Sequence, residues 1–591
     1  MRKILSLVGA LVLSSPLAAS GPAHGVVWLS FSDDAFTTAG REKKLVLLDL
    51  GAVWCHWCHV MEETTYRDPK VVSLLRRHFV SVRVDQDSRP DLSNRYEDYG
   101  WPATVIFDAK GQELVKFAGY IAPERMAALL DAVVKDPTPG PSVRPEAPVV
   151  SGSAALDPAR RKDLEALVTA RYDREHGGWG FSKKFLDWES VEYCLLRASS
   201  GDTDAALMAR QTLAKSRKLI DPVWGGLYQY SDSGDWDHPH FEKLAQFQAE
   251  GMRVYAEAYL LWGDPADLAA ARDIHRYARA FLTSLEGASY VSQDADLVAG
   301  EHSGAYYALD DAGRRRRGVP RVDTHLYARE TAWMANALVA LYAATGERQF
   351  LDEALAAAGW IVAERAIAGG GFRHDTSDAA GPYLGDTVAS GRAFLALYAA
   401  TGDRAWLSRA RKAADFIAAT FVVANTPGFV AAVPKSKFAP PRPQRDENAL
   451  AARFLNLLFR YTGDERYRRE ADQAMRFLAA RDVAEKFPTA SVVLADAELS
   501  AEPAHLTVVG ARDDARTQAL LLGALAYPAA YKRVELWDRR EGPLPNSDVD
   551  FPELEAPAAF ACAGGRCSLP SYTPEELRKR AARLREAPAA S

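Results

Sequence analysis

The chain has 591 residues, of which 48% are hydrophobic and 25% are charged, a composition typical of soluble globular proteins. A chain of this length predicts roughly two to four domains. The formal net charge of -6 gives no electrostatic reason to bind nucleic acid or an anionic membrane. We therefore expect no nucleic-acid partner, and we interpret the one dense basic run, at residues 314–317, as a solvated loop.

The first twenty residues have the order of a secretory signal peptide. Arg2 and Lys3 precede the apolar stretch 4–13, and small residues follow up to Ser20, after which cleavage is expected. The apolar stretch has ten residues, whereas a bilayer-spanning helix needs about twenty. We expect residues 1–20 to be removed and the mature chain to be periplasmic or secreted, with no membrane span.

The next segment, residues 25–135, alternates strand and helix signals in the order β-α-β-α-β-β-α. Apolar runs and cap residues predict the following elements in chain order: strands at 45–50 and 80–84 with a helix at 70–79 between them, a polar helix through Tyr99, strands at 103–107 and 113–117, and a helix at 123–135. Five prolines then fall within residues 136–152, which we interpret as a linker.

A pair of cysteines follows the first buried strand. In the run Cys55-His56-Trp57-Cys58, the first cysteine is expected at a helix N-terminus, where free backbone N–H groups and the helix dipole stabilise a thiolate. Two intervening residues allow the second sulfur to resolve a mixed disulfide. The spacing therefore predicts thiol–disulfide exchange, with Cys55 and Cys58 as the catalytic residues.

Three other positions support this interpretation. Trp101-Pro102 precedes a strand and is expected to form a cis bond that faces the dithiol. Asp49 lies six residues before Cys55 and is a candidate buried proton acceptor, and Trp54 directly precedes the first cysteine. Together with residues 82–87 and 101–111, these parts resemble thioredoxin.

The cysteines leave alternatives open. Residues 55–59 also fit the C-x-x-C-H pattern of covalent haem attachment. Cys55, Cys58, Cys562 and Cys567 together have the stoichiometry of a tetrahedral zinc site, and a purely structural disulfide is a further alternative. The buried strand before the motif and the strand at thioredoxin spacing after it favour redox exchange, so we expect neither a metal nor a cofactor.

Cys562 and Cys567 form a second close pair, separated by Ala-Gly-Gly-Arg. Export favours their oxidation to a disulfide. The pair is interpreted either as a local staple of the C-terminal tail or as an internal redox partner of Cys55 and Cys58. The remaining cysteine, Cys194, lies in an apolar run and is expected to be a buried small hydrophobe.

Residues 153–485 change to long, alanine-rich helices with repeated turns. A glycine followed by an acidic residue recurs at five places, where one helix is expected to end and the next to begin, namely Gly201, Gly263, Gly346, Gly402 and Gly463. The interval between Gly263 and Gly346 is longer and carries an insertion around 286–321. Repeated helix pairs predict a solenoid or a closed toroid. Residues 486–591 depart again and include a small βαβ element at 505–537.

The resemblance to known proteins extends over nearly the whole mature chain. The matching motifs are CHWCHVMEE at 55–63, GGWGFSKKF at 177–185, GGLYQY at 225–230, HPHFEK at 238–243, DAD at 294–296, GAYY at 304–307 and the C-terminal segment 567–577. The chain is similar to the family described as thioredoxin domain-containing or spermatogenesis-associated proteins. That resemblance implies a thioredoxin-like domain followed by an (α/α)6 toroid of the six-hairpin glycosidase type, with an associated C-terminal α/β element.

If the toroid forms, several aromatic and charged residues of the glycine-rich turns are expected at one mouth. They are Trp179, Lys183, Trp236, His240, Glu242, Asp294, Asp296 and Glu301. Aromatic faces beside carboxylates suit sugar binding or glycosidic acid–base chemistry, and a charged network that ties the loops together is the structural alternative. His240 and Glu242 are the favoured functional pair.

The sequence supports two main functions, and a non-catalytic interaction protein is a third hypothesis. The first is an exported thiol–disulfide oxidoreductase that acts on a protein thiol or disulfide partner and is fused to a helical toroid that binds its target. The alternative is a carbohydrate-active or carbohydrate-binding toroid, with a carbohydrate ligand and an accessory thioredoxin-like domain.

Overall fold

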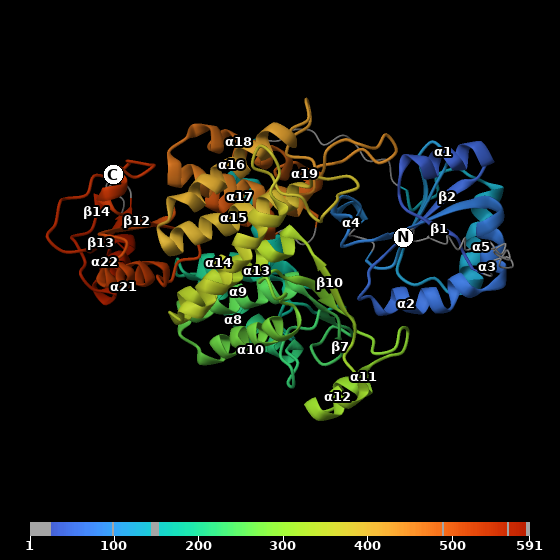
Figure 1. Cartoon of the computed structure of the whole chain (residues 1–591), viewed down its shortest axis with the longest axis horizontal. Coiled ribbons are helices and arrows are strands. Elements are labelled where there is room, and N and C mark those ends of the chain that lie inside the picture. The colour runs from blue at the N-terminus through green and yellow to red at the C-terminus, as the bar shows by residue number, and fades with distance from the viewer. Residues whose placement is uncertain (1–24, 97–99, 144–152, 487–489, 564–565, 587–591) are drawn as a thin grey trace, which may run out of the picture.

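The structure is a computed structural model that describes residues 25–96, 100–143, 153–486, 490–563 and 566–586. The expected signal peptide at 1–20 and the part of the linker at 144–152 lie outside the described residues. The N-terminal α/β unit lies at one end of the molecule, the helical region in the centre and the C-terminal sheet at the other end (Figure 1).

The N-terminal unit is built on a five-stranded sheet in the order β1-β3-β2-β4-β5. The first three of these strands are parallel to one another, whereas β4 and β5 are antiparallel to their neighbours. The strands are β1 (Trp28–Leu29), β2 (Leu45–Gly51), β3 (Phe79–Asp85), β4 (Ala103–Phe107) and β5 (Glu113–Ala118). The four strands predicted from apolar runs are confirmed, and β1 was not anticipated.

Helices cover both faces of this sheet because alternate residues of β2 are apolar on both sides. Val46, Leu48 and Leu50 belong to one core cluster, whereas Leu47 belongs to the other. The helices are α1 (Asp33–Glu42), α2 (His56–Glu63), α3 (Pro69–His78), α4 (Pro90–Tyr96) and α5 (Pro123–Lys135). This arrangement is the thioredoxin-like α/β fold, with a first helix, α1, that the sequence did not predict.

The central region is a closed ring of helix pairs. Within the described residues, six inner helices each pack against the next, and α20 packs against α7 to close the ring. The inner helices are α7 (Trp188–Ala198), α9 (Ala245–Trp262), α13 (Ala328–Thr345), α15 (Leu384–Thr401), α17 (Arg445–Thr462) and α20 (Ala490–Ser500). Their outer partners are α8 (Thr203–Ser216), α10 (Pro265–Phe281), α14 (Arg348–Trp360), α16 (Arg404–Thr420), α18 (Glu465–Leu478) and α6 (Pro158–Ala170). The toroid expected from the resemblance is therefore present.

The repeated glycines make the turns between inner and outer helices. Gly263, Gly346, Gly402 and Gly463 all have left-handed backbone angles, with φ between +65° and +72°, at the ends of inner helices. Asp264, Asp403 and Asp464 then cap the outer helices with their side chains. The sequence shows five such turns for six helix pairs. The sixth pair consists of α6 and α20, which come from opposite ends of the helical region and therefore have no turn between them.

The two ends of the ring are covered by different parts of the chain. The loops that precede the inner helices, including the insertion at 286–321, face the thioredoxin-like domain. The opposite end carries a four-stranded sheet, β12-β11-β13-β14, and β12 packs against α15 and α17. Its elements are β11 (Ala504–Val509), α21 (Ala515–Leu525), β12 (Lys532–Trp537), β13 (Ala558–Ala563), β14 (Arg566–Cys567) and α22 (Pro574–Glu586). The predicted βαβ element is confirmed, since β11 and β12 are parallel.

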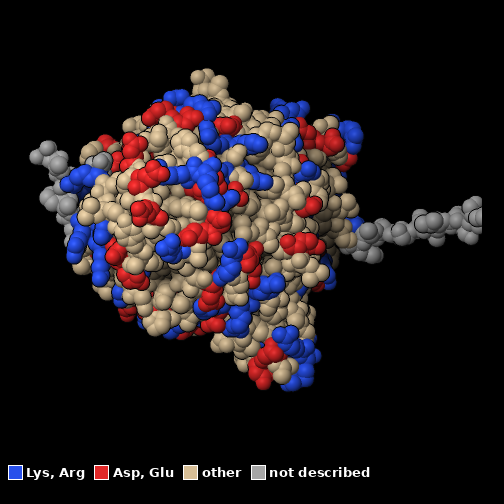
Figure 2. Space-filling view, turned by 60° about the vertical axis from the view of Figure 1, so that its left-hand side comes forward, with Lys and Arg blue, Asp and Glu red and all other residues tan. Residues whose placement is uncertain are grey.

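The basic run at 314–317 was expected to be a solvated loop. Arg315, Arg316 and Arg317 are exposed, as expected, but the run ends the helix α12 (Asp311–Arg317). The Arg314 guanidinium is completely buried and pairs with Asp221 at 2.6 and 3.0 Å. A buried guanidinium persists because the carboxylate compensates its charge. Elsewhere, acidic and basic side chains are interspersed over the face shown in Figure 2. No helix in the described parts of the chain combines the length and the apolar character that crossing a bilayer requires.

Candidate functional site

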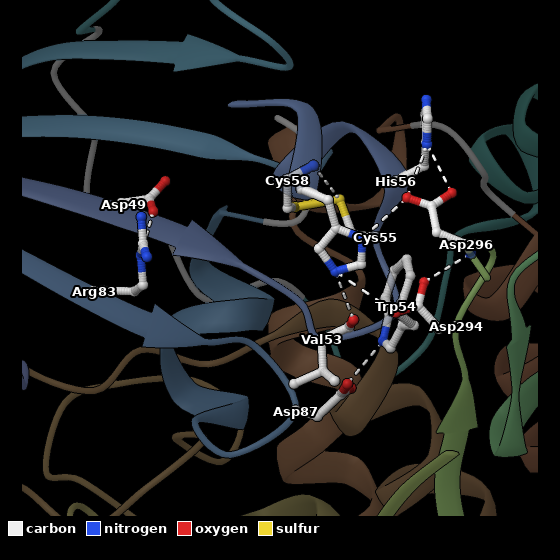
Figure 3. Close-up of a disulfide and its surroundings, with 11 residues drawn as sticks. Asp49, Val53, Trp54, Cys55, His56, Cys58, Arg83, Asp87, Asp294 and Asp296 are labelled. Carbon is white, nitrogen blue, oxygen red and sulfur yellow. Dashed lines mark hydrogen bonds and ion pairs between the residues drawn. A yellow bond between two sulfur atoms is a disulfide. The ribbon is translucent and has the colours of Figure 1, made fainter. Parts of the chain in front are cut away.

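The dithiol lies at the junction between the central strand of the first domain and its second helix. Cys55 is the N-cap of α2, and its Sγ accepts a hydrogen bond from the backbone N–H of Cys58 at 3.1 Å. The two cysteines form a disulfide with 5.3 Å between their Cα atoms (Figure 3). A Cβ atom added to Gly51, at the end of β2, would lie 3.4 Å from the Cys58 sulfur, at van der Waals contact, so the end of this strand passes directly beside the pair.

The disulfide is covered by the toroid. Cys55 is only 4% exposed, and the toroid residue Leu244 packs against the cluster of Ala52, Trp54 and Cys55. Trp101 packs on the same cluster, and its bond to Pro102 is cis, as predicted. Trp57, between the two cysteines, remains 41% exposed and lies beside Tyr120. The edge of the motif therefore faces solvent and Cys58 is half-buried, while Cys55 is covered by the toroid.

Two histidines of the redox helix bind a carboxylate of the toroid insertion. His56 Nδ1 lies 2.8 Å from Asp296 Oδ1, and His59 Nδ1 lies 3.1 Å from Asp296 Oδ2 (Figure 3). The other nitrogen of His59 lies 3.0 Å from the carbonyl oxygen of Val53 and 3.6 Å from Asp294 Oδ2. Because both ring nitrogens of His59 face acceptors, the geometry calls for the doubly protonated imidazolium.

The charges of this cluster reinforce one another. The hydrogen bond to Asp296 raises the pKa of His56. Burial opposes protonation of His59, but Asp296 and Asp294 outweigh it and raise the pKa of His59 as well. Burial alone would raise the pKa of Asp296, yet the hydrogen bonds from both histidines lower it to about 2. The surroundings of both imidazoles therefore favour their protonated, positive form, and positive charge beside a cysteine favours its thiolate.

Two further toroid carboxyls lie near the motif and titrate near neutrality. Burial raises the pKa of Asp294 to about 6 and that of Glu242 to about 7. The backbone N–H and the side-chain charge of His56, the first residue of α2, act in the opposite direction on Glu242. The Oε2 atom of Glu242 is buried and has no hydrogen-bond partner among the residues that the structure describes. Such a carboxyl can exchange a proton near neutral pH.

A second anchor joins the two domains behind the dithiol. Trp54 Nε1 donates to Asp87 Oδ2 at 2.8 Å, and His374 Nε2 of the toroid lies 2.7 Å from the Asp87 carbonyl oxygen. Burial opposes protonation of His374, but the charge of Asp386 raises its pKa to about 9. Phe438, also of the toroid, stacks on Phe36 of α1 with ring centroids 4.5 Å apart. The toroid therefore holds the redox domain on both sides of the motif.

Asp49, a candidate proton acceptor beneath the pair, is buried and paired with a cation. Its Oδ2 accepts a hydrogen bond from Arg83 at 2.8 Å on the neighbouring strand, apart from the sulfurs (Figure 3). Burial raises the pKa of Asp49, and the Arg83 guanidinium opposes the rise.

The predicted toroid residues lie in different surroundings in the structure. Glu242, Asp294 and Asp296 gather at the redox helix. Trp179 and Trp236 are 1% and 2% exposed, and each donates its indole N–H to a backbone carbonyl, so neither offers a face to a sugar. Lys183 and Glu301 are exposed, and the Lys183 ammonium lies 4.6 Å from the Tyr230 ring centroid.

His240 and Glu242, the favoured functional pair, have different neighbours. His240 Nε2 lies 2.6 Å from Asp232 Oδ2 and its ring stacks on Tyr230, whereas Glu242 faces the redox helix. Sequence reasoning missed the role of His56 and His59. The signal was their position, because each directly follows one of the two cysteines.

The alternative interpretations of the cysteines lose support from the geometry. Cys562 and Cys567 are opposite each other on β13 and β14, where they form a disulfide at the far end of the molecule from α2 (Figure 1). Four cysteines so placed cannot share a zinc ion. Both nitrogens of His59 are already engaged, which leaves none for a haem iron. Cys194 is buried, as predicted.

Three side chains of this group, His59, Asp294 and Asp296, each have a potential metal-ligand atom within 4.8 Å of those of the other two, which is close enough for a shared metal ion. Because the histidine already forms hydrogen bonds within this group, we describe it as a hydrogen-bonded cluster.

The fold and the site define a thioredoxin-like domain whose CxxC disulfide is docked on a helical toroid. In agreement, residues 13–134 match the family model Thioredox_DsbH, described as a protein of unknown function, DUF255. The motif-based resemblance is also confirmed, since the chain is 28% identical to human spermatogenesis-associated protein 20 over 337 residues. That match covers 50% of this chain and 42% of the human protein, so the chain spans about two fifths of the relative's length.

Two other proteins are similar to separate parts of the chain. The thiol:disulfide interchange protein DsbD of Ralstonia nicotianae is 32% identical over 128 residues, which are 20% of this chain and 21% of that protein. A sugar epimerase from a ruminal bacterium superposes with a TM-score of 0.44 and 14% identity, over 53% of this chain and 83% of the epimerase.

Proposed function

We propose that the chain is a thiol–disulfide oxidoreductase in which Cys55 and Cys58 carry the reaction and the toroid supplies the ionisable groups beside them. The observation that carries the proposal is the docking of Asp296 on His56 and His59, which places toroid carboxylates against the helix that begins at Cys55. A purely structural disulfide needs no such surroundings, whereas a reactive one needs a stabilised thiolate and a proton acceptor.

The reaction begins with the reduced pair. The Cys55 thiolate, stabilised by the N-terminus of α2 and by the two imidazolium groups, attacks one sulfur of a substrate disulfide. A bond forms between Cys55 and that sulfur, and the other substrate sulfur leaves as a thiolate. The pair and the substrate are then joined in a mixed disulfide.

The second step returns the pair to the disulfide state. Glu242 accepts the proton of the remaining thiol of the pair, and the resulting thiolate attacks Cys55. The Cys55–Cys58 bond forms, the second substrate sulfur leaves as a thiolate, and the substrate has gained two electrons from the dithiol. The same steps in reverse, with an external thiol reductant, restore the reduced pair.

The cover over the sulfurs defines which partners can react. A small disulfide needs only a path to Cys55, whereas a protein partner requires the toroid segment around Leu244 to move away. The exposed Trp57 then offers an apolar contact at the edge of the motif. We retain the proposal of a protein thiol or disulfide partner and, from residues 1–20, of export.

The test is the turnover of two disulfide substrates by the full chain, oxidised glutathione as a small one and insulin as a protein one, with dithiothreitol as the reductant. We expect Cys55→Ser and Cys58→Ser to abolish turnover above the background of the reductant. The matched control is the double variant Cys562→Ser/Cys567→Ser, which removes the other disulfide and should retain turnover. Equal turnover by Cys55→Ser and the unchanged protein would overturn the proposal.

A further inference from the structure

The axis of the toroid contains two adjoining cavities that the redox site does not use. One, of about 480 Å³, is lined by the first turns of the inner helices and by Asn94 of α4. The other, of about 200 Å³, lies toward the C-terminal sheet and reaches β12. Four charged residues line both cavities and mark the level where the two adjoin: Glu192, Arg253, Arg392 and Arg453.

Two of these arginines are fully compensated. Arg253 donates to Glu192 at 2.8 Å, to Glu250 at 2.7 Å and to Glu257 at 2.9 Å. Arg453 donates to Glu192 and also, at 2.8 and 3.0 Å, to Glu498. Each guanidinium therefore has at least two carboxylates, the arrangement expected for buried charges.

Arg392 differs from both of them. It lies on α15 between Val388 and Leu395, with its side chain on the same cavity walls, yet it forms no hydrogen bond or ion pair with any residue that the structure describes. Burial and the neighbouring charge of Arg453 lower the pKa of Arg392. The charges of Glu250 and Glu192 act on Arg392 in the opposite direction, but neither carboxylate is paired with it. An enclosed guanidinium without a directly bonded carboxylate, next to two other cations, is costly for a folded protein to keep.

The larger cavity is lined by charged side chains of both signs and by a group of aromatic rings. Trp188, Phe247 and Trp333 line the larger cavity, and the first two are in edge contact with ring centroids 5.1 Å apart. Such a wall suits the carbon skeleton of an organic molecule, while a guanidinium suits a planar carboxylate or a phosphate through two parallel hydrogen bonds.

We propose that the axial cavity binds a small organic anion whose carboxylate or phosphate group pairs with Arg392. The ligand supplies the directly paired anion that Arg392 lacks, and its body packs against the aromatic rings of the wall. None of the sequence-predicted toroid residues lines this cavity. The site is also separate from the dithiol, so the proposal does not rest on redox activity, and a Cys55→Ser variant should bind the anion unchanged.

The binding test uses glucuronate and inorganic phosphate as anionic probes and glucose as the neutral counterpart of glucuronate. Titration calorimetry on the full chain should show saturable binding of at least one anion, and glucose should not bind or compete. Because a bidentate charged pair is removed, Arg392→Met should weaken that binding by about tenfold or more. Arg348→Met is the matched control, since Arg348 is 68% exposed on an outer helix, and it should bind like the unchanged protein.

A second readout needs no ligand. In thermal unfolding without added anion, Arg392→Met should be at least as stable as the unchanged protein, because an uncompensated charge has been removed. Arg453→Met, in the same cavity, should be clearly less stable, because Glu192 and Glu498 lose their shared cation.

The proposal is overturned if neither anion binds with a Kd below about 1 mM. It is also overturned if glucose binds as tightly as glucuronate, if Arg392→Met leaves anion affinity unchanged, or if Arg392→Met destabilises the protein as Arg453→Met does.

Discussion

At the scale of single residues, the site depends on carboxyl groups whose surroundings drive their pKa values apart. Burial raises the pKa of Glu242 to about 7, whereas two imidazoles lower that of Asp296 to about 2. Near neutral pH, the first carboxyl is therefore able to gain or lose a proton and the second is a fixed negative charge. This division assigns proton transfer to Glu242 and orientation of the histidines to Asp296.

The change Glu242→Gln removes the proposed proton acceptor. We expect disulfide exchange at pH 8 to slow by about a hundredfold and the rise in rate around pH 7 to disappear. The measurement is turnover of oxidised glutathione as a function of pH. Glu301→Gln changes an exposed carboxyl nearby and should leave the profile as it is; an unchanged profile in Glu242→Gln would exclude the role.

Stability should change with pH in the same variant. A carboxyl whose pKa is raised by folding contributes stability that is present below its unfolded pKa of 4.5 and is lost as the pH rises through its folded pKa of about 7. The unchanged protein should therefore lose stability relative to Glu242→Gln between pH 4.5 and 7. The difference in thermal midpoint between the two proteins, measured across that range, gives the sign directly.

Asp296→Asn removes the charge that holds His56 and His59 protonated. We expect the pKa of both imidazoles to fall, observable by NMR titration, and the pKa of the Cys55 thiol to rise, observable as slower alkylation at mildly acidic pH. Because the pKa of Asp296 is lowered by folding, the stability that it contributes is present above pH 3.8 and is lost as the pH falls toward 2. Histidines that titrate as before would contradict the assignment.

At the scale of elements, the turn glycines offer a matched test of packing between the toroid and the C-terminal sheet. Gly402 and Gly263 have nearly equal φ angles, +67° and +70°. A Cβ atom at Gly402 would lie 2.7 Å from the Leu536 Cβ atom, whereas one at Gly263 would meet nothing within 4 Å. Gly263→Ala should cost about 1 kcal/mol from the backbone alone, and Gly402→Ala clearly more. Equal losses in chemical denaturation would show that the sheet is not packed on this turn.

The elements also show what the sequence could predict. The strands at 45–50 and 103–107 were predictable because their apolar runs are continuous, and the turns at Gly402 and Gly463 because glycine and an acidic cap are local signals. Helix α1 was not anticipated, although Ser32 followed by Asp33 and Asp34 is a local signal for the start of a helix.

The candidate site was predictable only in part. Cys55 and Cys58 lie close in sequence, but His56 and Asp296 are 240 residues apart, and no spacing rule relates them. The acidic residues of the insertion were therefore interpreted either as part of a sugar site or as a charged network between toroid loops, although they lie against the redox helix.

At the scale of the whole molecule, the toroid determines how accessible the dithiol is. The docked domain buries Cys55, and the contact between Phe438 and Phe36 holds the far side of that domain. Opening this contact should expose the sulfurs without altering the cysteines themselves. The accessibility of Cys55 and its intrinsic reactivity can therefore be changed by separate substitutions.

Phe438→Ala should loosen the docking. In the reduced protein, we expect a bulky polymer-linked maleimide to modify Cys55 much more slowly than iodoacetamide does, and Phe438→Ala to remove most of that difference. Phe181→Ala, at a residue that is 65% exposed, is the control and should keep the difference. If the unchanged protein reacts equally fast with both reagents, Cys55 is accessible in solution and the toroid does not restrict access to it.

The central claim is that Cys55–Cys58 is a redox-active pair and not a staple. Its most direct test is the redox equilibrium of the full chain in thiol–disulfide buffers of graded potential, read by alkylation and mass spectrometry at each cysteine. We predict that Cys55–Cys58 interconverts reversibly at a potential above about −300 mV, while Cys562–Cys567 stays oxidised there, in the unchanged protein and in Cys55→Ser. If Cys55–Cys58 stays oxidised together with Cys562–Cys567 throughout that range, the redox account is contradicted.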